Sequence, residues 1–193
     1  MRGSKTQAAE NRERIIAAAA QAFREHGFGG IGVADLMQRV GMTHGGFYGH
    51  FSSKDELVAL ACRRAVDDML ADWRSRIAAV PGDPLASIVD PYLGAAHRDA
   101  PGTGCLMAAV GPDAARAAPE VRRAVTACLA DVLDTLACQL PAAAPARRRA
   151  EAIDLFTRLV GAMIVARAVD DPALSDEILA AARAGIEASL TGR

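Results

Sequence analysis

The side chains whose types and spacing suit a binding function gather in one stretch, residues 41–57, which reads GMTHGGFYGHFSSKDEL. If this stretch only packed short helices against one another, its apolar rings, Phe47 and Phe51, would be enough. Three further side chains add a hydroxyl, an imidazole and an ammonium group: Tyr48, His50 and Lys54. All three groups form hydrogen bonds. This surplus of polar groups favours contact with another molecule over packing alone.

The elements expected around this stretch form a helix-turn-helix. The octet 33–40, VADLMQRV, predicts a helix that ends at Gly41, a residue able to take the positive φ of a tight turn. Thr43 occupies the N-cap position of a second, short helix over residues 44–50, where its hydroxyl can accept from an exposed backbone N–H. A helix, a tight turn and a short second helix is the plan of a helix-turn-helix DNA reader.

Three glycines interrupt the short second helix: Gly45, Gly46 and Gly49. Glycine costs roughly 1 kcal/mol relative to alanine inside a helix. Such a density is understandable if the backbone must approach another surface, such as the wall of a DNA groove. Another glycine run, residues 27–32, matches G-x-G-x-x-G, but a helix rather than a strand precedes it. We interpret that run as turn residues, not as a dinucleotide site.

The charge of the chain is unevenly distributed. The 193 residues carry a net charge of −1. Residues 1–54 hold seven basic against four acidic groups, whereas the remainder holds 15 basic against 19 acidic groups. A basic amino-terminal module on an acidic body suits phosphate contact at one end only.

Apolar periodicity predicts an all-α fold of about nine or ten helices. Hydrophobic residues make up 51% of the chain and aromatic residues only 4%, and much of the difference is alanine, which favours helices. Ser53 and Glu56 form a capping box that starts a long helix. No alternating strand pattern occurs. The expected helices cover residues 6–26, 33–40, 44–50, 54–79, 83 to about 99, 105 onward with a break at 111–112, 120–140, 147–169 and 175–190.

Several other classes of protein are disfavoured. No apolar run approaches the ~18 residues of a membrane span, and the four cysteines show no C-x-x-C spacing. We therefore expect a reduced, cytoplasmic protein without a membrane partner. No E-x-x-H pair, G-x-S-x-G elbow or phosphate loop occurs, and the acidic pairs 67–68 and 170–171 suit solvated surfaces. The sequence predicts neither an enzyme nor a bound cofactor or metal.

The same residues resemble the TetR-type family of bacterial transcriptional regulators. The matching positions in the central stretch are Gly41, Thr43, Gly45, Phe47, Tyr48, His50, Phe51, Lys54 and Leu57, and those of the lead-in are Ile16, Ala19, Phe23, Gly27, Phe28, Val33 and Leu36. The resemblance covers roughly residues 8–60. It implies a helix-turn-helix DNA-binding domain over residues 1–54 and a helical ligand-binding and dimerisation domain over residues 55–193.

The resemblance also implies roles for individual residues. In the family, residues matching Thr43, Tyr48 and Lys54 contact phosphates, and the amino end of the short helix meets base edges. Carried over, this makes His44 the best base-reading candidate. The residues expected to bind double-stranded operator DNA are Thr43, His44, Gly45, Gly46, Tyr48, His50, Lys54, Arg39 and Lys5. With glycine at positions 46 and 49, DNA shape and a basic arm with Arg2 and Lys5 gain weight in recognition.

A homodimer is the next implication, formed by the last two helices across a two-fold axis. Their apolar faces carry Ile153, Phe156, Val160, Met163 and Ile164 on one helix, and Ile178, Leu179, Ala182, Ile186 and Leu190 on the other. Such faces also suit an ordinary core. Paired helix-turn-helix units read palindromes, which favours the dimer.

A small, largely apolar inducer is the expected ligand, lowering DNA affinity from a site in the middle of the chain. Its expected contacts are Tyr92, His97, Met107, Phe156, Leu159 and Met163, because adaptable apolar side chains alternate there with a few polar ones. A rival trigger is Cys105, at an expected helix start, acting as a redox or electrophile sensor. A helical protein-interaction adaptor is a third hypothesis, which lack of DNA binding would favour.

Overall fold

The computed structural model describes residues 2–80, 82–141 and 144–191, with side chains from Lys5 to Leu190 within these ranges. All regular structure in the described ranges is helical, which confirms the all-α prediction. None of the helices in these ranges is long and apolar enough to cross a membrane.

Nine α-helices and two 3₁₀ helices make up the described part of the chain. They are α1 (Arg2–His26), α2 (Val33–Arg39), η1 (His44–Gly49), α3 (Lys54–Ala79), α4 (Ala86–Tyr92), α5 (Ala95–Asp99), η2 (Pro101–Thr103), α6 (Leu106–Arg116), α7 (Pro119–Ala137), α8 (Pro145–Ala168) and α9 (Pro172–Thr191).

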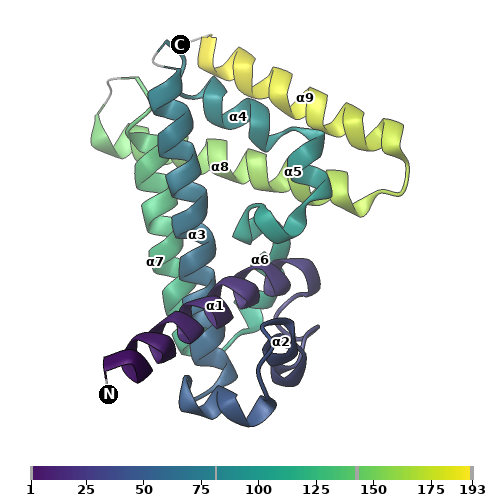
Figure 1. Ribbon diagram of the computed structural model, residues 1–193. Helices are drawn as coiled ribbons and strands as arrows, with labels where there is room; N and C mark the ends of the chain where they lie inside the picture. The colour runs from purple at the N-terminus through teal and green to yellow at the C-terminus, as the bar shows by residue number, and fades with distance from the viewer. Residues whose placement is uncertain (1, 81, 142–143, 192–193) are drawn as a thin grey trace.

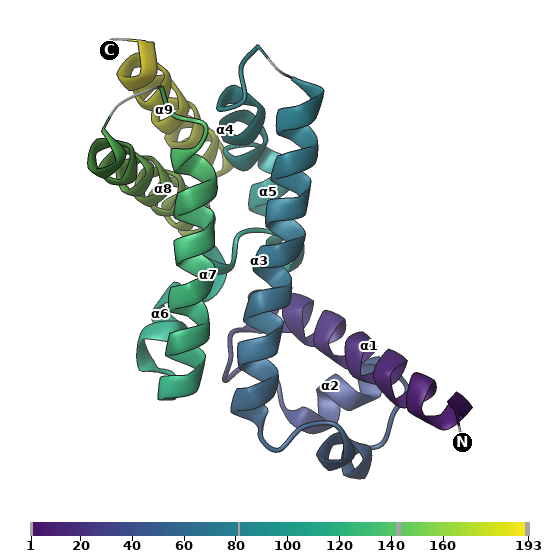
Figure 2. The ribbon, with the colours of Figure 1, turned by 90° about the vertical axis from the view of Figure 1, so that its left-hand side faces the viewer.

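Helix α3 runs the length of the molecule (Figures 1 and 2). Helices α1 and α2 lie at one end of it, whereas α4, α8 and α9 lie at the other, and α7 lies alongside (Figure 2). The apolar side chains of α3 recur every three or four residues and are buried: Leu57, Val58, Ala61, Cys62, Ala65, Val66, Leu70 and Trp73. One continuous core therefore joins both ends of the molecule.

The start of α3 follows the capping chemistry expected from the sequence, except that the Glu56 carboxylate bonds Ser52 instead of Ser53. The Ser53 hydroxyl accepts from the Glu56 backbone N–H at 3.0 Å. The Glu56 carboxylate returns to Ser52, whose backbone N–H and hydroxyl donate to it at 2.7 and 2.8 Å, and these bonds lower the pKa of Glu56. Four orphan N–H groups at a helix start need such partners, and the expected bounds of α3 are correct.

The region expected to form one helix from residue 83 to about 99 is divided, so that prediction is wrong. Asp83 still caps the start, because its Oδ1 accepts from Ala86 N–H at 2.9 Å. Pro91 lies inside α4, where it has no N–H for the helix ladder, and the chain turns at Leu93 and Gly94 before α5. The break expected at residues 111–112 is a bend at Val110 (φ −132°, ψ 18°), just before Pro112.

Candidate functional site

The stretch singled out by the sequence presents a polar face to solvent. Thr43, His44, Gly45 and Gly46 are exposed, and 65% of Tyr48 is accessible. Phe47 is buried beneath them and lies against Phe51, with ring centroids 5.4 Å apart. The His44 and Tyr48 rings meet edge to face at 6.0 Å. The buried phenyl ring thus anchors a short segment whose polar groups point outward.

This segment differs from the expected α-helix because it is the 3₁₀ helix η1. Thr43 does occupy the N-cap position, but within the described residues its side chain makes no capping bond. Its backbone carbonyl instead accepts from Gly46 N–H at 3.0 Å. Three glycines in six residues weaken α-helix propagation, which accounts for the tighter, shorter form.

The glycines of η1 have space around them. A Cβ added at Gly45 or Gly49 would meet no atom of the described chain within 4 Å, and one at Gly46 would make only ordinary contacts. Gly41 is different, because its φ of +73° is the positive value predicted for the turn. The backbone conformation therefore requires glycine at 41, whereas neither conformation nor packing within the chain requires it at 45 or 49.

The basic residues expected to bind DNA have partners within the chain. The Lys54 ammonium donates to the Ile31 carbonyl at 2.7 Å, and Arg39 pairs with Glu25 at 3.1 Å. His50 is half-buried beside Phe51. Lys5 is exposed on α1, which begins at Arg2 rather than at residue 6, so an extended arm is not observed, and the side chain of Arg2 lies outside the described residues.

A second feature is a cleft of about 730 Å³ between the two ends of the molecule. Helix α3 contributes Met69, Asp72, Trp73 and Arg76 to its wall. These positions are spaced i, i+3, i+4 and i+7, so they lie on one face of the helix. This helical spacing is the feature of the sequence from which the four residues could have been grouped. Further lining residues come from α1, α4, α5 and the start of α6: Arg24, Ile88, Tyr92, His97, Gly104 and Cys105.

The residues expected to bind an inducer are distributed over different environments. Tyr92 and His97 line the cleft. Met107 and Phe156 line a much smaller void of about 10 Å³. Leu159 and Met163 are fully buried in the core. Sequence reasoning missed Arg24, which reaches the cleft from the amino-terminal end of the molecule.

His97 is held in one tautomer. Its Nδ1 lies 2.7 Å from the Tyr92 carbonyl, which only accepts, so Nδ1 carries the proton. Its Nε2 accepts from the Cys105 backbone N–H at 2.9 Å. Burial lowers the pKa of His97, and the positive charge of Arg167 acts in the same direction. The neutral ring thus ties α5 to the start of α6.

The carboxyl end of α1 is attached to the body at three points. The Arg24 guanidinium donates to the Gly104 carbonyl at 3.1 Å, and Asp113 accepts from Phe28 N–H at 3.1 Å. Gly102 packs so closely on α1 that a Cβ there would overlap the Glu25 carboxylate. The loop at residues 100–105 therefore packs tightly on α1 at Gly102, where a side chain would have to displace Glu25.

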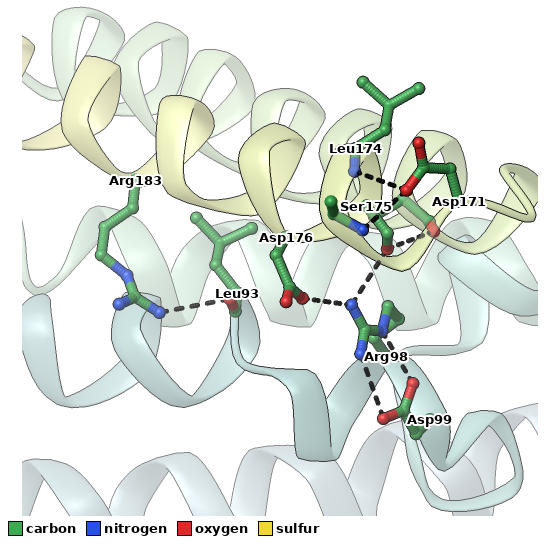
Figure 3. Close-up of polar contacts among 10 residues, drawn as sticks. Leu93, Arg98, Asp99, Asp171, Leu174, Ser175, Asp176 and Arg183 are labelled. Carbon is green, nitrogen blue, oxygen red and sulfur yellow. Dashed lines mark hydrogen bonds and ion pairs between the residues drawn. The ribbon is translucent and has the colours of Figure 1, made fainter.

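The segment just before this loop, which contains Leu93 and Arg98, is joined to α9. Figure 3 shows Arg98 of α5 between three partners, the carboxylates of Asp99 and Asp176 and the hydroxyl of Ser175, at 2.5 to 3.0 Å. Arg183 of α9 donates to the Leu93 carbonyl at 3.2 Å (Figure 3). One wall of the cleft is thereby fixed to the carboxy-terminal helix pair.

Comparison with known proteins agrees with this architecture. Residues 15–61 match the model of a family described as bacterial regulatory proteins, tetR family. The curated relatives that match are helix-turn-helix transcriptional regulators. TtgR of Pseudomonas putida is 41% identical over 58 residues, which are 30% of this chain and 28% of TtgR. The chain spans less than two thirds of the length of these relatives, between 28% and 63%.

Two solved structures have a similar fold. Reduced E. coli NemR superposes with a TM-score of 0.75 at 20% identity, covering 92% of this chain and 95% of NemR. A TetR-family transcriptional regulator from Agrobacterium tumefaciens has a TM-score of 0.75 at 21% identity, covering 93% of this chain and 98% of that one. At these identities the likeness establishes the all-α fold of the chain.

The neutral state of His97 predicts a dependence of stability on acid. Because the folded chain lowers the pKa of His97, stability is complete above the ordinary value of about 6.5 and is lost as the pH falls through it, when the unfolded chain binds the proton first. Urea unfolding at pH 7 and pH 5 should show a smaller loss in His97→Gln, whose amide can still donate and accept. The other histidines are common to both proteins, so equal losses would contradict the assignment.

Proposed function

We propose that this chain is a sequence-specific DNA-binding transcriptional regulator, and specifically a repressor released from its operator by a small, largely apolar ligand. The match of residues 15–61 to the tetR family and the fold of the chain support this proposal. The observation that carries the proposal is the exposed polar face of η1 above the buried Phe47. A short segment anchored by one aromatic ring and edged with hydrogen-bonding groups suits the major groove of DNA.

Within that face, each group has a proposed role. Thr43 and Tyr48 donate to phosphate oxygens, and His44, at the amino end of η1, reads a base edge. The backbone at Gly45, Gly46 and Gly49 approaches the groove wall, since glycine at 45 and 49 has no packing reason inside the chain. Lys5, Arg39, His50 and Lys54 position the module, and Lys54 does so by holding the Ile31 carbonyl as well.

We assign DNA binding to residues 1–54 and ligand binding and dimerisation to residues 55–193. The two parts share α3 as a common core element, and the bonds of Arg24 and Phe28 join them directly. A cytoplasmic location goes with this proposal, because operator DNA lies in the cytoplasm of a bacterium.

Dimerisation through α8 and α9 is proposed with a revised set of contacts. Phe156, Met163, Leu179 and Ile186 are buried within the single chain and are therefore core residues. The solvent-facing side of α8 still carries Ile153 (44% exposed), Ile164 (38%) and Val165 (50%). Gly161 on α8 and Gly185 on α9 have open space where a Cβ would stand, which permits close approach of helices from a second chain.

The 730 Å³ cleft is the proposed ligand site, because its volume falls within the range of small-molecule pockets. A ligand acts only through different affinities for the DNA-competent and released forms. Cys105 supports a second candidate, a thiol sensor, because the cysteine is buried but lines this cleft. Release of DNA by an oxidant that disappears in Cys105→Ser would favour the thiol over the ligand.

The operator assignment predicts two distinguishable kinds of loss. Tyr48→Phe removes a phosphate donor and should weaken binding by roughly 1–2 kcal/mol on every sequence. His44→Ala should relax preference at one base position, a discrimination of about 1–3 kcal/mol. Fluorescence anisotropy with a promoter fragment, its point variants and random DNA measures both, over a salt series. Equal affinity of the wild type for operator and random DNA at every salt concentration would contradict base reading.

The open glycines predict a separation of stability from DNA binding. Gly49→Ala should raise the free energy of unfolding by about 0.5–1 kcal/mol, because alanine loses less backbone entropy, and yet weaken operator binding, because the added methyl meets the groove. Urea unfolding and anisotropy measure the two effects. Gly82→Ala, at another open glycine outside η1, is the matched control and should leave operator affinity unchanged. Unchanged affinity in Gly49→Ala would remove the close-approach argument.

The proposed dimer surface includes Ile164, which is exposed in the single chain. The Ile164→Asp variant should fold normally but be a monomer at micromolar concentration, because an unpaired carboxylate is costly at an apolar interface. Light scattering and circular dichroism test this. Val80→Asp, a change at another exposed apolar residue on the end of α3, should remain a dimer. A wild type that is monomeric at micromolar concentration would refute the proposed interface.

A further inference from the structure

We propose that the cleft binds a carboxylate-bearing ligand, with its acid group at Arg24 and the Tyr92 hydroxyl and its apolar body against Met69, Trp73 and Ile88. This inference rests on the proposed function, because it names the class of ligand that acts at the cleft. Two features of the site lead to it, donors without strong acceptors and a guanidinium without an ion pair, and the apolar side chains in the wall suit the body of such a ligand.

Donors without acceptors gather at the inner side of the cleft. Among the buried polar atoms of the described residues, Tyr92 Oη, Arg24 Nε and Arg167 Nη1 have no hydrogen-bond partner. Tyr92 is only 5% exposed, and both it and Arg24 line the cleft. Burial raises the pKa of the Tyr92 hydroxyl well above its ordinary value, and the charge of Cys105 and a hydrogen bond to its sulfur act in the same direction. Tyr92 is therefore a neutral donor whose neighbour is a weak sulfur acceptor, and a buried donor without a strong acceptor is unfavourable.

Positive charge at and beside the cleft also lacks an ionic partner: Arg24 lines the cleft, whereas Arg167 lies next to Gly104 and lines a neighbouring hollow. Arg24 and Arg167 take part in no ion pair between described side chains and donate only to backbone carbonyls, those of Gly104, His97 and Arg98. Burial lowers the pKa of both guanidinium groups. A buried cation without a carboxylate is costly, and an anionic group that enters the site relieves that cost.

The acidic residues of the cleft do not supply the missing carboxylate, because each already has an arginine on its own helix. Asp68 pairs with Arg64 at 2.8 Å, and Asp72 pairs with Arg76 at 2.6 Å. Asp68 still attracts Arg24 electrostatically, but burial outweighs this attraction. The neutral His97 adds no charge. The cleft thus holds one guanidinium without an ion pair, that of Arg24, which an organic acid would match.

The position of Arg24 also indicates how such a ligand would act. Arg24 belongs to α1, which packs on the helix-turn-helix, whereas its bond partner Gly104 belongs to the body. A carboxylate that accepts from the unpartnered Nε of Arg24 binds the same guanidinium whose Nη1 donates to the Gly104 carbonyl, so it changes the position and charge of the group that makes that bond. Ligand binding and the attachment of α1 to the body are then linked through one side chain, which supplies the different affinities that a switch requires.

Matched pairs of acids and amides test the proposal on the full-length protein. The probes are benzoate and benzamide, 4-phenylbutanoate and 4-phenylbutanamide, and decanoate and decanamide. Trp73, the only tryptophan of the chain, lines the cleft and reports binding by fluorescence, and thermal shift provides a second measurement. At least one acid should bind tenfold or more tightly than its amide. Equal binding of acid and amide in every pair, or no binding of any acid, would overturn the proposal.

Two variants locate the acid group. Tyr92→Phe keeps the ring and should weaken the acid about tenfold while leaving the amide unchanged. Arg24→Gln keeps a donor for Gly104 and should abolish the preference for acid over amide. Arg76→Gln, a cleft arginine already paired with Asp72, is the matched control and should retain the preference, as should Cys105→Ser. Unchanged acid binding in both Arg24→Gln and Tyr92→Phe would overturn the assignment.

Operator anisotropy measured with the same probes separates this inference from the proposed function. An acid that binds at the cleft and releases DNA supports both. An acid that binds with the predicted dependence on Arg24 but leaves the operator bound supports the ligand class and contradicts the ligand-operated switch. Release of DNA by the amides alone would contradict the ligand class while leaving the switch in place.

Discussion

The packing of α3 in two directions is the constraint on which the rest of the molecule depends. Its buried face runs without interruption from Leu57, beneath the helix-turn-helix, to Trp73, in the wall of the cleft. Because protein interiors are close-packed, a displacement at one end of such a helix cannot be absorbed locally and is transmitted along it. The capping of its start by Ser53 and Glu56 makes the first turn part of the same rigid element. Both candidate sites therefore share one mechanical support.

The arrangement of charges differs between the two candidate sites. Along α3, arginines and aspartates four residues apart neutralise one another, as in Arg64 with Asp68 and Arg76 with Asp72. Exposed pairs of this kind contribute little to stability, but they keep the acidic side chains of α3 from compensating Arg24. At η1, by contrast, hydrogen-bonding groups face solvent without nearby acidic partners on the same segment. Pairing within α3 leaves Arg24 in the cleft available to a ligand. The absence of acidic residues within η1 leaves its exposed polar groups available to another molecule.

Local signals in the sequence were sufficient where the structure is decided locally. The bounds of α3 and the positive φ of Gly41 both follow from capping and turn chemistry. The exposed group of polar residues around η1 could also be located from its motif. The burial of Ile186 within a single chain is set by distant contacts and could not be predicted. The 3₁₀ form of η1 and the division at Gly94 have local causes, the glycines of η1 and Pro91, but the helical pattern of the sequence did not show how these would alter the elements. An apolar helix face does not reveal whether its partner is the same chain or another. Arg24 was missed for a related reason, because its partner Gly104 lies 80 residues away in sequence.

The attachment of α1 through Arg24 and Gly102 limits how far the molecule can be treated as two exchangeable modules. A chimera that grafts residues 1–54 onto another regulatory body would carry Arg24 away from the Gly104 carbonyl and would place α1 against a loop not shaped for it. Under the proposed function, such a protein would retain its operator preference and lose its response to the ligand. The loop at residues 100–105 packs on α1 although it lies in the other half of the sequence, so a graft designed to preserve the proposed control must transfer both together.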